Sequence, residues 1–364
     1  MEKAEKTKKR LSTPKIILVA VLILLVLLIV GFGVFTLIKL YGMSINHTKI
    51  VPKPTVAPYA LVTPVPGIVD VTGDPDDLTQ DVDPSLDPSM IFDTEIYQED
   101  PIDPNVVNIL VVGEDAGGSG STSGRSDVML IVSYNQQRNT IRAVSVLRDT
   151  WVYIPGRDVW NRVNTAYRFG GIGLAINTVN SNFGLDIQYY MKTDFENLVQ
   201  IVDILGGLDI TLTSAEIEYY NENVVRDDPI VPGPNGLCHL DGKQVLAHCR
   251  NRTIGNGDWS RTERQRAVMS AFLSRAKKEK DIASLTSLMY KLMDYVETNL
   301  SPWDMLSMSS NLIFGATPSE PLKGTIPCSG SWNYAYENGM AVIHADLEMN
   351  KDWIRSFFYG YGAQ

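Results

Sequence analysis

The sequence predicts the α/β fold class: a single-pass membrane anchor followed by an extracellular α/β domain, αβα sandwich-like, with a mixed central sheet. Three observations support this prediction. Residues 16–38 carry no charge, residues 39–105 are acidic and rich in proline, and residues 106–364 alternate short β-branched runs with runs of helical period. Strands interleaved with helices are typical of this class, and about 260 residues suffice for one large domain.

The uncharged run 16–38 predicts a transmembrane helix, because at ~1.5 Å rise per residue it crosses a hydrocarbon core of ~30 Å. A cleaved signal peptide is the alternative, but the run is long for a signal core and ends without a small-residue cleavage site. Residues 1–15 form a basic tail that favours the cytoplasm, with Lys3, Lys6, Lys8, Lys9, Arg10 and Lys15. We therefore expect a cell-membrane protein whose C-terminal domain is extracellular.

Residues 39–105 are predicted to form an acidic, Pro-rich extracellular linker. There is no Lys or Arg between Lys53 and Arg125, and aspartates accumulate among prolines. Such a composition buries too little apolar surface to offset chain entropy, so we expect disorder from about residue 49 to about residue 101. A calcium loop is the alternative, although it needs tighter carboxylate spacing with a glycine turn.

The three cysteines are too few for a disulfide scaffold, but an extracellular domain can carry one bridge. Cys238 and Cys249 flank a short predicted helix, 240–248, and a bridge between them is one of two open possibilities. The neighbouring His239 and His248 suggest zinc only superficially, because their spacing matches no common structural site. We expect both histidines on the surface.

The predicted secondary structure of 106–364 begins with strands at 106–113, 127–134 and 141–147, the last two joined as a hairpin through 136–139. Helical periodicity marks 171–183 and 194–205, and glycines end the second of these before a strand at 208–212. The clearest helix is 261–280, for which Asp258 or Ser260 would be the N-cap, with Glu263 as the capping-box partner of Ser260.

Arginines concentrate in the last third of a chain whose net charge is −10. They are Arg250, Arg252, Arg261, Arg264 and Arg266. Guanidinium groups bind phosphate oxygens through two parallel hydrogen bonds, and the N-terminus of a helix adds free N–H groups for an anion. The pattern predicts a phosphate-binding site.

Two carboxylates flank a glycine-serine loop, 116–125, between the first two strands. Asp115 and Asp127 are hard oxygen ligands that suit Mg²⁺ or Mn²⁺, and the loop lacks the Lys of a Walker motif. Arg148 and Asp149 end the third strand, where α/β sheets bind ligands. A strand-end salt bridge is the alternative interpretation of that pair.

These motifs, in order, resemble the LytR-CpsA-Psr family of bacterial cell-envelope proteins. The resemblance covers about residues 107–276. It depends on seven motifs: Gly113-Glu-Asp115, Arg125-Ser-Asp127, Leu147-Arg-Asp-Thr150, Asn161-Arg-Val-Asn164-Thr-Ala-Tyr167 with Gly170-Gly171, Leu205-Gly-Gly-Leu-Asp209, Leu240-Asp-Gly242, and Arg250-Asn-Arg252 through Asp258, Arg261, Arg264 and Gln265.

The resemblance implies a Mg-dependent phosphotransferase that moves a glycopolymer from a polyprenyl-pyrophosphate carrier to peptidoglycan, typically to the C6 hydroxyl of N-acetylmuramic acid. Its partners would be the polyprenyl-pyrophosphate-linked glycan donor, the peptidoglycan acceptor and the membrane. Which glycan is carried, teichoic acid, capsule or another polymer, stays open. The implied residues are Arg148, Asp149, Arg250 and Arg252 for catalysis, Arg125, Arg162, Asn164, Arg261, Arg264 and Gln265 for substrate, and Asp115 and Asp127 for Mg²⁺.

Two implied roles need a remark. Asp149 would orient an arginine or accept the proton of the attacking hydroxyl. Arg162 stands where the family commonly has lysine, so the charge is kept but the geometry differs. The lipid needs an apolar tunnel, and the helices that contain Phe183 and Phe195 could form either its wall or an ordinary core.

Two other functions compete with transfer. One is a polyprenyl-pyrophosphate-glycan hydrolase with water as acceptor, and the other is a non-catalytic polyprenyl-phosphate-binding membrane regulator. The acidic net charge and the expected extracellular location count against a nucleic-acid partner.

Overall fold

The computed structural model describes residues 48–53, 93–115, 125–224, 227–278, 281–314 and 321–360, all within one unit, Asn46–Gln364. The predicted anchor 16–38 and the predicted tail 1–15 lie outside these ranges. In the described part, no helix combines the length and apolar character needed to span a membrane.

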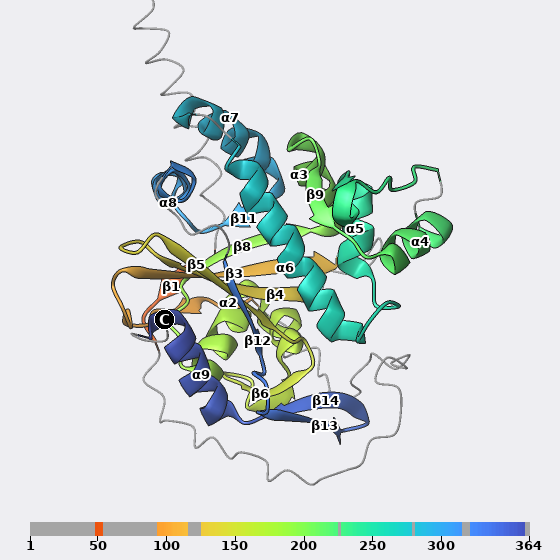
Figure 1. The fold of residues 1–364 in the computed structure, drawn as a ribbon. Helices are drawn as coiled ribbons and strands as arrows, with labels where there is room; N and C mark the ends of the chain where they lie inside the picture. The colour runs from red at the N-terminus through yellow and green to blue at the C-terminus, as the bar shows by residue number, and fades with distance from the viewer. Residues whose placement is uncertain are drawn as a thin grey trace, which may run out of the picture. The chain divides into compact units, whose positions relative to one another are not determined.

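A six-stranded sheet forms the centre of the domain (Figure 1). Its order is β11-β8-β3-β4-β5-β12. β3, β4 and β5 run antiparallel in sequence, β8 is parallel to β3, and β12 is parallel to β5. The mixed α/β fold and the predicted hairpin are thus confirmed. The strands are β3 (Val106–Asp115), β4 (Arg125–Asn135), β5 (Thr140–Val146), β8 (Tyr189–Asp194), β11 (Glu297–Thr298) and β12 (Leu322–Ile326).

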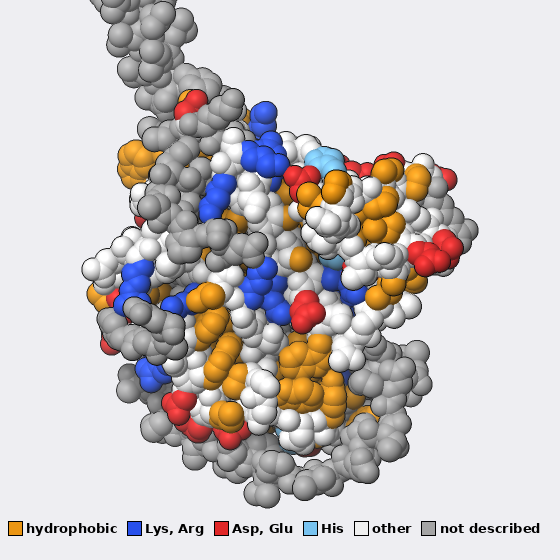
Figure 2. All heavy atoms as spheres, in the orientation of Figure 1, with side chains coloured by type: hydrophobic (Ala, Val, Ile, Leu, Met, Phe, Trp, Pro, Cys, Tyr) orange, Lys and Arg blue, Asp and Glu red, His pale blue; other side chains and the backbone are white. Residues whose placement is uncertain are grey.

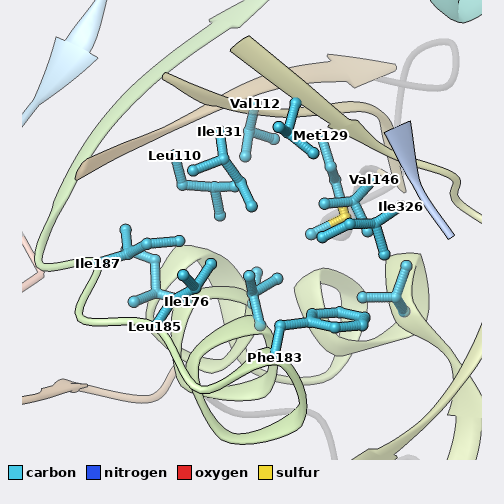
Figure 3. Close-up of a cluster of buried hydrophobic side chains, with 14 of the residues drawn as sticks. Leu110, Val112, Met129, Ile131, Val146, Ile176, Phe183, Leu185, Ile187 and Ile326 are labelled. Atoms are coloured by element: carbon cyan, nitrogen blue, oxygen red, sulfur yellow. The ribbon is translucent and has the colours of Figure 1, made fainter. Parts of the chain in front are cut away.

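One face of this sheet packs on α2 (Val163–Phe183) and α9 (Leu347–Tyr359). Figure 3 shows alternate residues of the strands, among them Leu110, Ile131 and Val146, pointing at Ile176 and Phe183 of α2. Phe183 is fully buried there. It therefore belongs to the core, which settles one of the two open interpretations for this side chain.

Helix α2 begins earlier than the predicted 171–183 because it consists of two helical pieces joined at a kink. Gly170 and Gly171 have non-helical backbone angles, and Gly171 has φ 61°, a conformation that favours glycine. Gly173 is needed for a different reason. A Cβ there would lie 1.8 Å from the carbonyl oxygen of Thr94.

That close approach corrects the prediction of disorder at the two ends of the predicted linker, 39–105, that the structure describes. β1 (Ile50–Val51) pairs in parallel with β2 (Ile96–Tyr97), and the Tyr97 amide donates to Asn177 of α2 at 2.9 Å. Residues 48–53 and 93–105 are therefore ordered parts of the domain. Their composition did not predict this order, because each segment contributes only a short strand to a surface provided by α2.

The other face of the sheet carries a second helical layer and a second core. It contains α3 (Phe195–Ile204), α5 (Gly242–Arg250), α6 (Gly257–Ala276) and the antiparallel pair of β9 (Leu208–Thr211) and β10 (Leu237–Leu240). In Figure 1, α6 crosses in front of the sheet. Further elements are α4 (Ser214–Asn223), η2 (Pro234–Gly236), α7 (Ile282–Leu292), η3 (Met293–Tyr295) and α8 (Pro302–Phe314).

Cys238 and Cys249 are buried in this second core as free thiols, so the bridge between them is not formed. Cys328 is also free and buried. His248 is buried as well, contrary to the prediction that it lies on the surface. His239 is exposed as expected.

A four-stranded sheet, β13-β14-β6-β7, lies beside the central one. Its strands are β6 (Thr150–Ile154), β7 (Val159–Arg162), β13 (Trp332–Glu337) and β14 (Met340–Ala345). β6 begins directly after Asp149, and β14 pairs with it in parallel. Residues from near the C-terminus therefore meet the end of β5.

Candidate functional site

The C-terminal ends of four strands share one edge of the central sheet. β3 and β8 are parallel, β5 and β12 are parallel, and β3 and β5 both run opposite to β4. This places the segments after Val146 and after Asp194 at the edge where β4 begins. Arg148 and Asp149, predicted together at the end of one strand, therefore lie at the edge where open α/β sheets bind ligands.

The turn that carries Arg148 and Asp149 is held by three parts of the chain. The Thr150 hydroxyl donates to the Leu147 carbonyl at 2.7 Å. The Asn164 amide donates to the Arg148 carbonyl at 3.3 Å, and the Ile343 amide donates to the Asp149 carbonyl at 2.9 Å. The two charged side chains therefore start from a fixed backbone.

Asp258, in the first turn of α6, is the hub of an ion-pair network. Its carboxylate lies 2.9 Å from Arg148 Nε, 3.3 Å from an Arg261 terminal nitrogen and 3.7 Å from Arg252 Nε. The Arg261 side chain is 4% exposed and that of Arg252 is 37% exposed. The network thus runs from the interior to the surface.

Asp149 extends the network to a fourth arginine. Its carboxylate lies 3.4 Å from the Nε of Arg148 and 3.4 Å from the Nε of Arg162. Arg162 also donates to the carbonyl of Ala341 on β14. The four guanidinium groups outnumber the two carboxylates, Asp149 and Asp258, so the network has a net positive charge that suits a pyrophosphate.

The two carboxyl groups differ electrostatically. Burial raises the pKa of Asp149, against the opposing effects of Arg148 and Arg162. Burial also acts to raise the pKa of Asp258, but Arg148, Arg261 and Arg252 together lower it below its usual value. One buried Oδ1 atom in each carboxylate has no hydrogen-bond partner among the described residues. Asp258 is therefore the fixed anion and Asp149 the better proton acceptor.

Arg250 ends α5, two residues before Arg252 of this network. Its guanidinium carbon lies 4.9 Å from the ring centroid of Phe195, the first residue of α3. A cation over an aromatic face is attracted by the ring quadrupole, so Phe195 orients this arginine. Phe195 is half-buried. Its contact with Arg250 is a role that neither the tunnel-wall nor the core interpretation of this helix included.

Arg264 has contacts that differ from its predicted role in substrate binding. Its three guanidinium nitrogens donate to Glu216 at 2.7 Å and to the carbonyls of Asn251 and Ile254 at 3.0 and 2.6 Å. These bonds tie α6 to the 251–256 loop that carries Arg252. Arg264 is a positioning residue, because its nitrogens are already engaged by the protein.

Other members of the predicted set lie around the network. Asn164 is buried and contributes its main-chain amide, and Gln265 is half-buried on α6. Arg266 pins α6 to the sheet through Ser145 Oγ at 2.9 Å. The predicted cap of α6 is corrected: Asn256 occupies the N-cap, and Ser260 Oγ accepts from its amide at 2.7 Å.

The side chains of Asp115, Arg125 and Asp127 lie outside the described residues, but their backbone positions are defined. Asp115 pairs with Arg125, and the register of β3 with β4 shifts between Gly113 and Glu114, which leaves Asp127 as the extra residue of a bulge. Bulges re-aim side chains near active sites. Within the described part of the chain, no cluster of three or more metal-binding side chains occurs.

The sequence motifs contain two residues of this region whose contacts they do not predict. Asp258 is an ion-pair hub rather than the predicted helix cap, and its position between Arg252 and Arg261 is the signal that indicates it. Tyr167 donates to Glu114 at 3.2 Å, and burial with the neighbouring Glu114 raises its pKa. No spacing in the sequence indicated that pair.

Comparison with known proteins identifies a family. The LytR_cpsA_psr family matches residues 85–349. A relative from Bacillus mycoides, the polyisoprenyl-teichoic acid–peptidoglycan teichoic acid transferase TagU, is 29% identical over 255 residues, which are 67% of this chain and 80% of that protein.

Solved structures share the fold. TagT bound to LIIa-WTA superposes with a TM-score of 0.57 at 21% identity, covering 70% of this chain and 92% of that one. The family protein YwtF (TagT) with bound octaprenyl pyrophosphate lipid gives a TM-score of 0.54 at 20% identity, covering 72% and 94%.

Proposed function

Because this chain belongs to the LytR_cpsA_psr family, we propose that it transfers a glycopolymer from a polyprenyl-pyrophosphate carrier to peptidoglycan, forming a phosphodiester bond. The observation that carries the proposal is the network of Arg148, Arg162, Arg252 and Arg261 around Asp149 and Asp258. The relative TagU is named as a transferase of teichoic acid to peptidoglycan, which supports the same reaction class.

The arginines would bind the two phosphates of the donor. Arg252 is the most exposed of the four and Arg250 lies beside it at the end of α5, so these two are placed to meet an incoming donor. Arg148 and Arg261 are held by Asp258 from inside. Pre-positioned cations stabilise the charge that develops on the transferred phosphoryl group without reorganising during the reaction.

Asp149 would accept the proton of the attacking hydroxyl. The acceptor oxygen attacks the phosphorus that bears the glycan, a new P–O bond forms, and the bond to the polyprenyl phosphate breaks. The proton goes to the carboxylate, and polyprenyl phosphate leaves as an anion. A carboxyl group whose pKa is raised by burial is a better base for this task than an exposed one.

Mg²⁺ is the proposed cofactor, with Mn²⁺ as a substitute. The backbone supports a fit, since Asp115 ends β3 and Asp127 occupies the bulge of β4 at the same sheet edge. Carboxylate oxygens are the preferred ligands of Mg²⁺, and the bound ion would neutralise phosphate charge. Arg125, paired with Asp115, would contact the same phosphates.

The lipid would lie on the sheet face beneath α6. Val111, Val132 and Ile141 alternate with core residues and so belong to that second face, where they stay half-buried. Apolar surface of this kind suits a polyprenyl chain. With the anchor expected at 16–38 and the domain outside the cell, the site would work at the extracellular surface of the cell membrane.

The test is transfer of a labelled polyprenyl-pyrophosphate glycan to peptidoglycan oligomers with Mg²⁺, by wild type, Arg250→Ala and Asp127→Ala. We expect acceptor-linked product from wild type alone. Free sugar phosphate without acceptor-linked product would identify a hydrolase. Absence of metal-dependent turnover while the donor still binds would identify a non-catalytic binding module.

A further inference from the structure

Three aromatic side chains form a surface cluster beside the arginine network. Trp259 of α6 and Trp332 of β13 have ring centroids 4.9 Å apart, and Tyr334 meets Trp332 edge-on at 5.1 Å. The Trp259 indole N–H donates to the Tyr334 hydroxyl at 3.3 Å. Figure 2 shows hydrophobic side chains gathered on this face, between the start of α6 and the β13–β14 hairpin. We call these three residues the aromatic platform.

The platform is not part of the hydrophobic core. Tyr334 is 37% exposed, and Trp259 and Trp332 are half-buried. Ala335, on the opposite face of β13, packs instead against Trp151 and Val342. The face of β13 that packs into the fold therefore carries Ala335, whereas the aromatic rings stand on the opposite face. Exposed clusters of this kind mark binding sites more often than single exposed rings do.

Two short covalent and hydrogen-bonded paths join the platform to the reacting groups. Trp259 follows the hub residue Asp258 in the chain. Tyr334 pairs with Ile343 across the β13–β14 ladder, and the Ile343 amide donates to the Asp149 carbonyl. Two strand spacings, about 10 Å, therefore separate the Tyr334 backbone from that of Asp149. A sugar chain longer than one ring spans a distance of that size.

The chemistry of the platform suits a sugar. A hexose ring has a face of C–H groups and a rim of hydroxyls, so it stacks its C–H face on the electron-rich face of an indole and hydrogen-bonds at the edge. The platform offers two partly exposed indole rings, Trp259 and Trp332, while Tyr334 supplies a hydroxyl. A polyprenyl chain, by contrast, is a hydrocarbon and cannot form hydrogen bonds with polar groups at the rim.

We propose that the aromatic platform binds the glycan strand of the peptidoglycan acceptor and presents its hydroxyl to Asp149. This inference rests on the proposed function and adds the binding surface for the acceptor. The acceptor is favoured over the sugars of the donor because the backbone of Ile343 connects Tyr334 to Asp149, whereas the surface assigned to the lipid is the sheet face beneath α6.

The experiment is calorimetric titration of the full-length protein with lipid-free peptidoglycan glycan oligomers and, separately, with polyprenyl pyrophosphate. Trp332→Ala should weaken oligomer binding by about tenfold, the loss expected for one stacked aromatic, and leave pyrophosphate binding unchanged. Trp332→Phe should recover part of the affinity. The matched control is Trp303→Ala on α8, a tryptophan that is 72% exposed and away from the platform.

Tyr334→Ala serves as a second variant should Trp332→Ala fail to fold. Unchanged oligomer affinity in the folded variants overturns the proposal, as does an equal loss of affinity for polyprenyl pyrophosphate. A different result would contradict the proposed function without contradicting the platform proposal. Wild type that binds oligomers through Trp332 but never forms acceptor-linked product would keep the platform and lose the transferase.

Discussion

Arg148 Nε donates to Asp258 Oδ2 at 2.9 Å, and this bond joins two residues 110 positions apart in the chain. It connects the turn after β5 to the first turn of α6. The contact shows why a strand-end arginine and a helix N-terminus belong to one site. It also makes Asp258 the residue that sets the direction of three guanidinium groups.

Replacing Arg148 with Ala should reduce the rate of transfer by about a hundredfold, because removing one pre-positioned donor to the developing charge costs that order of magnitude. The rate is measured as acceptor-linked product per unit time at saturating donor. Arg138→Ala is the matched control, since Arg138 is exposed in the β4–β5 turn. A rate for Arg148→Ala equal to that of this control would remove Arg148 from the reaction.

Asp149→Asn should abolish most of the transfer activity. The remaining rate should no longer fall on the acid side of the pH–rate profile. Burial raises the pKa of Asp149, so the base loses activity by protonation at a higher pH than an ordinary aspartate would. The rate of wild type should therefore fall as the pH falls through that raised pKa. Asp304→Asn, on exposed α8, should keep the wild-type profile. An unaltered profile in Asp149→Asn would assign the acid limb to another group.

Arg264→Ala should lower the free energy of unfolding by about 3 kcal/mol, because it leaves Glu216 buried without its cation. Urea denaturation measures this change. The double variant Glu216→Gln/Arg264→Met should recover part of the loss by removing the unpaired charge. Donor affinity measured per folded molecule should fall together with stability, because Arg264 holds the loop that carries Arg252. A loss of affinity without loss of stability would return Arg264 to the substrate site.

His248 should make the domain acid-sensitive. Burial lowers the pKa of His248 to about 4 from the ordinary 6.5, against the raising effect of Glu216. Between these two values the unfolded chain binds the proton and the folded chain does not, so the free energy of unfolding rises with pH across this window.

The expected loss of stability on acidification from pH 6.5 to pH 4 is about 3 kcal/mol, from the difference of the two pKa values. Urea denaturation at several pH values measures it. His248→Gln should remove this part of the pH dependence and keep a partner for the Tyr220 hydroxyl, which lies 3.1 Å from Nδ1. A slope unchanged in the variant would assign the acid sensitivity to carboxylates.

Periodicity and motif order predicted the sheet, the hairpin, α3 and the body of α6 because these elements follow local rules. They could not predict that Thr94 would pack against Gly173, since a short strand becomes stable only on the surface that another element supplies. In the site, the residue types were visible as motifs. Their roles were separated by tertiary contacts alone: Arg148 and Arg264 look alike in sequence, yet one meets Asp258 and the other Glu216.

The strand β14 has a consequence for the order of folding. Its amide at Ile343 donates to Asp149, and its carbonyl at Ala341 accepts from Arg162, a residue 179 positions earlier in the chain. Contacts between residues this far apart in sequence form only after a large loss of chain entropy has been overcome. A chain folded only as far as α6 therefore lacks the support that β14 gives to Asp149 and Arg162.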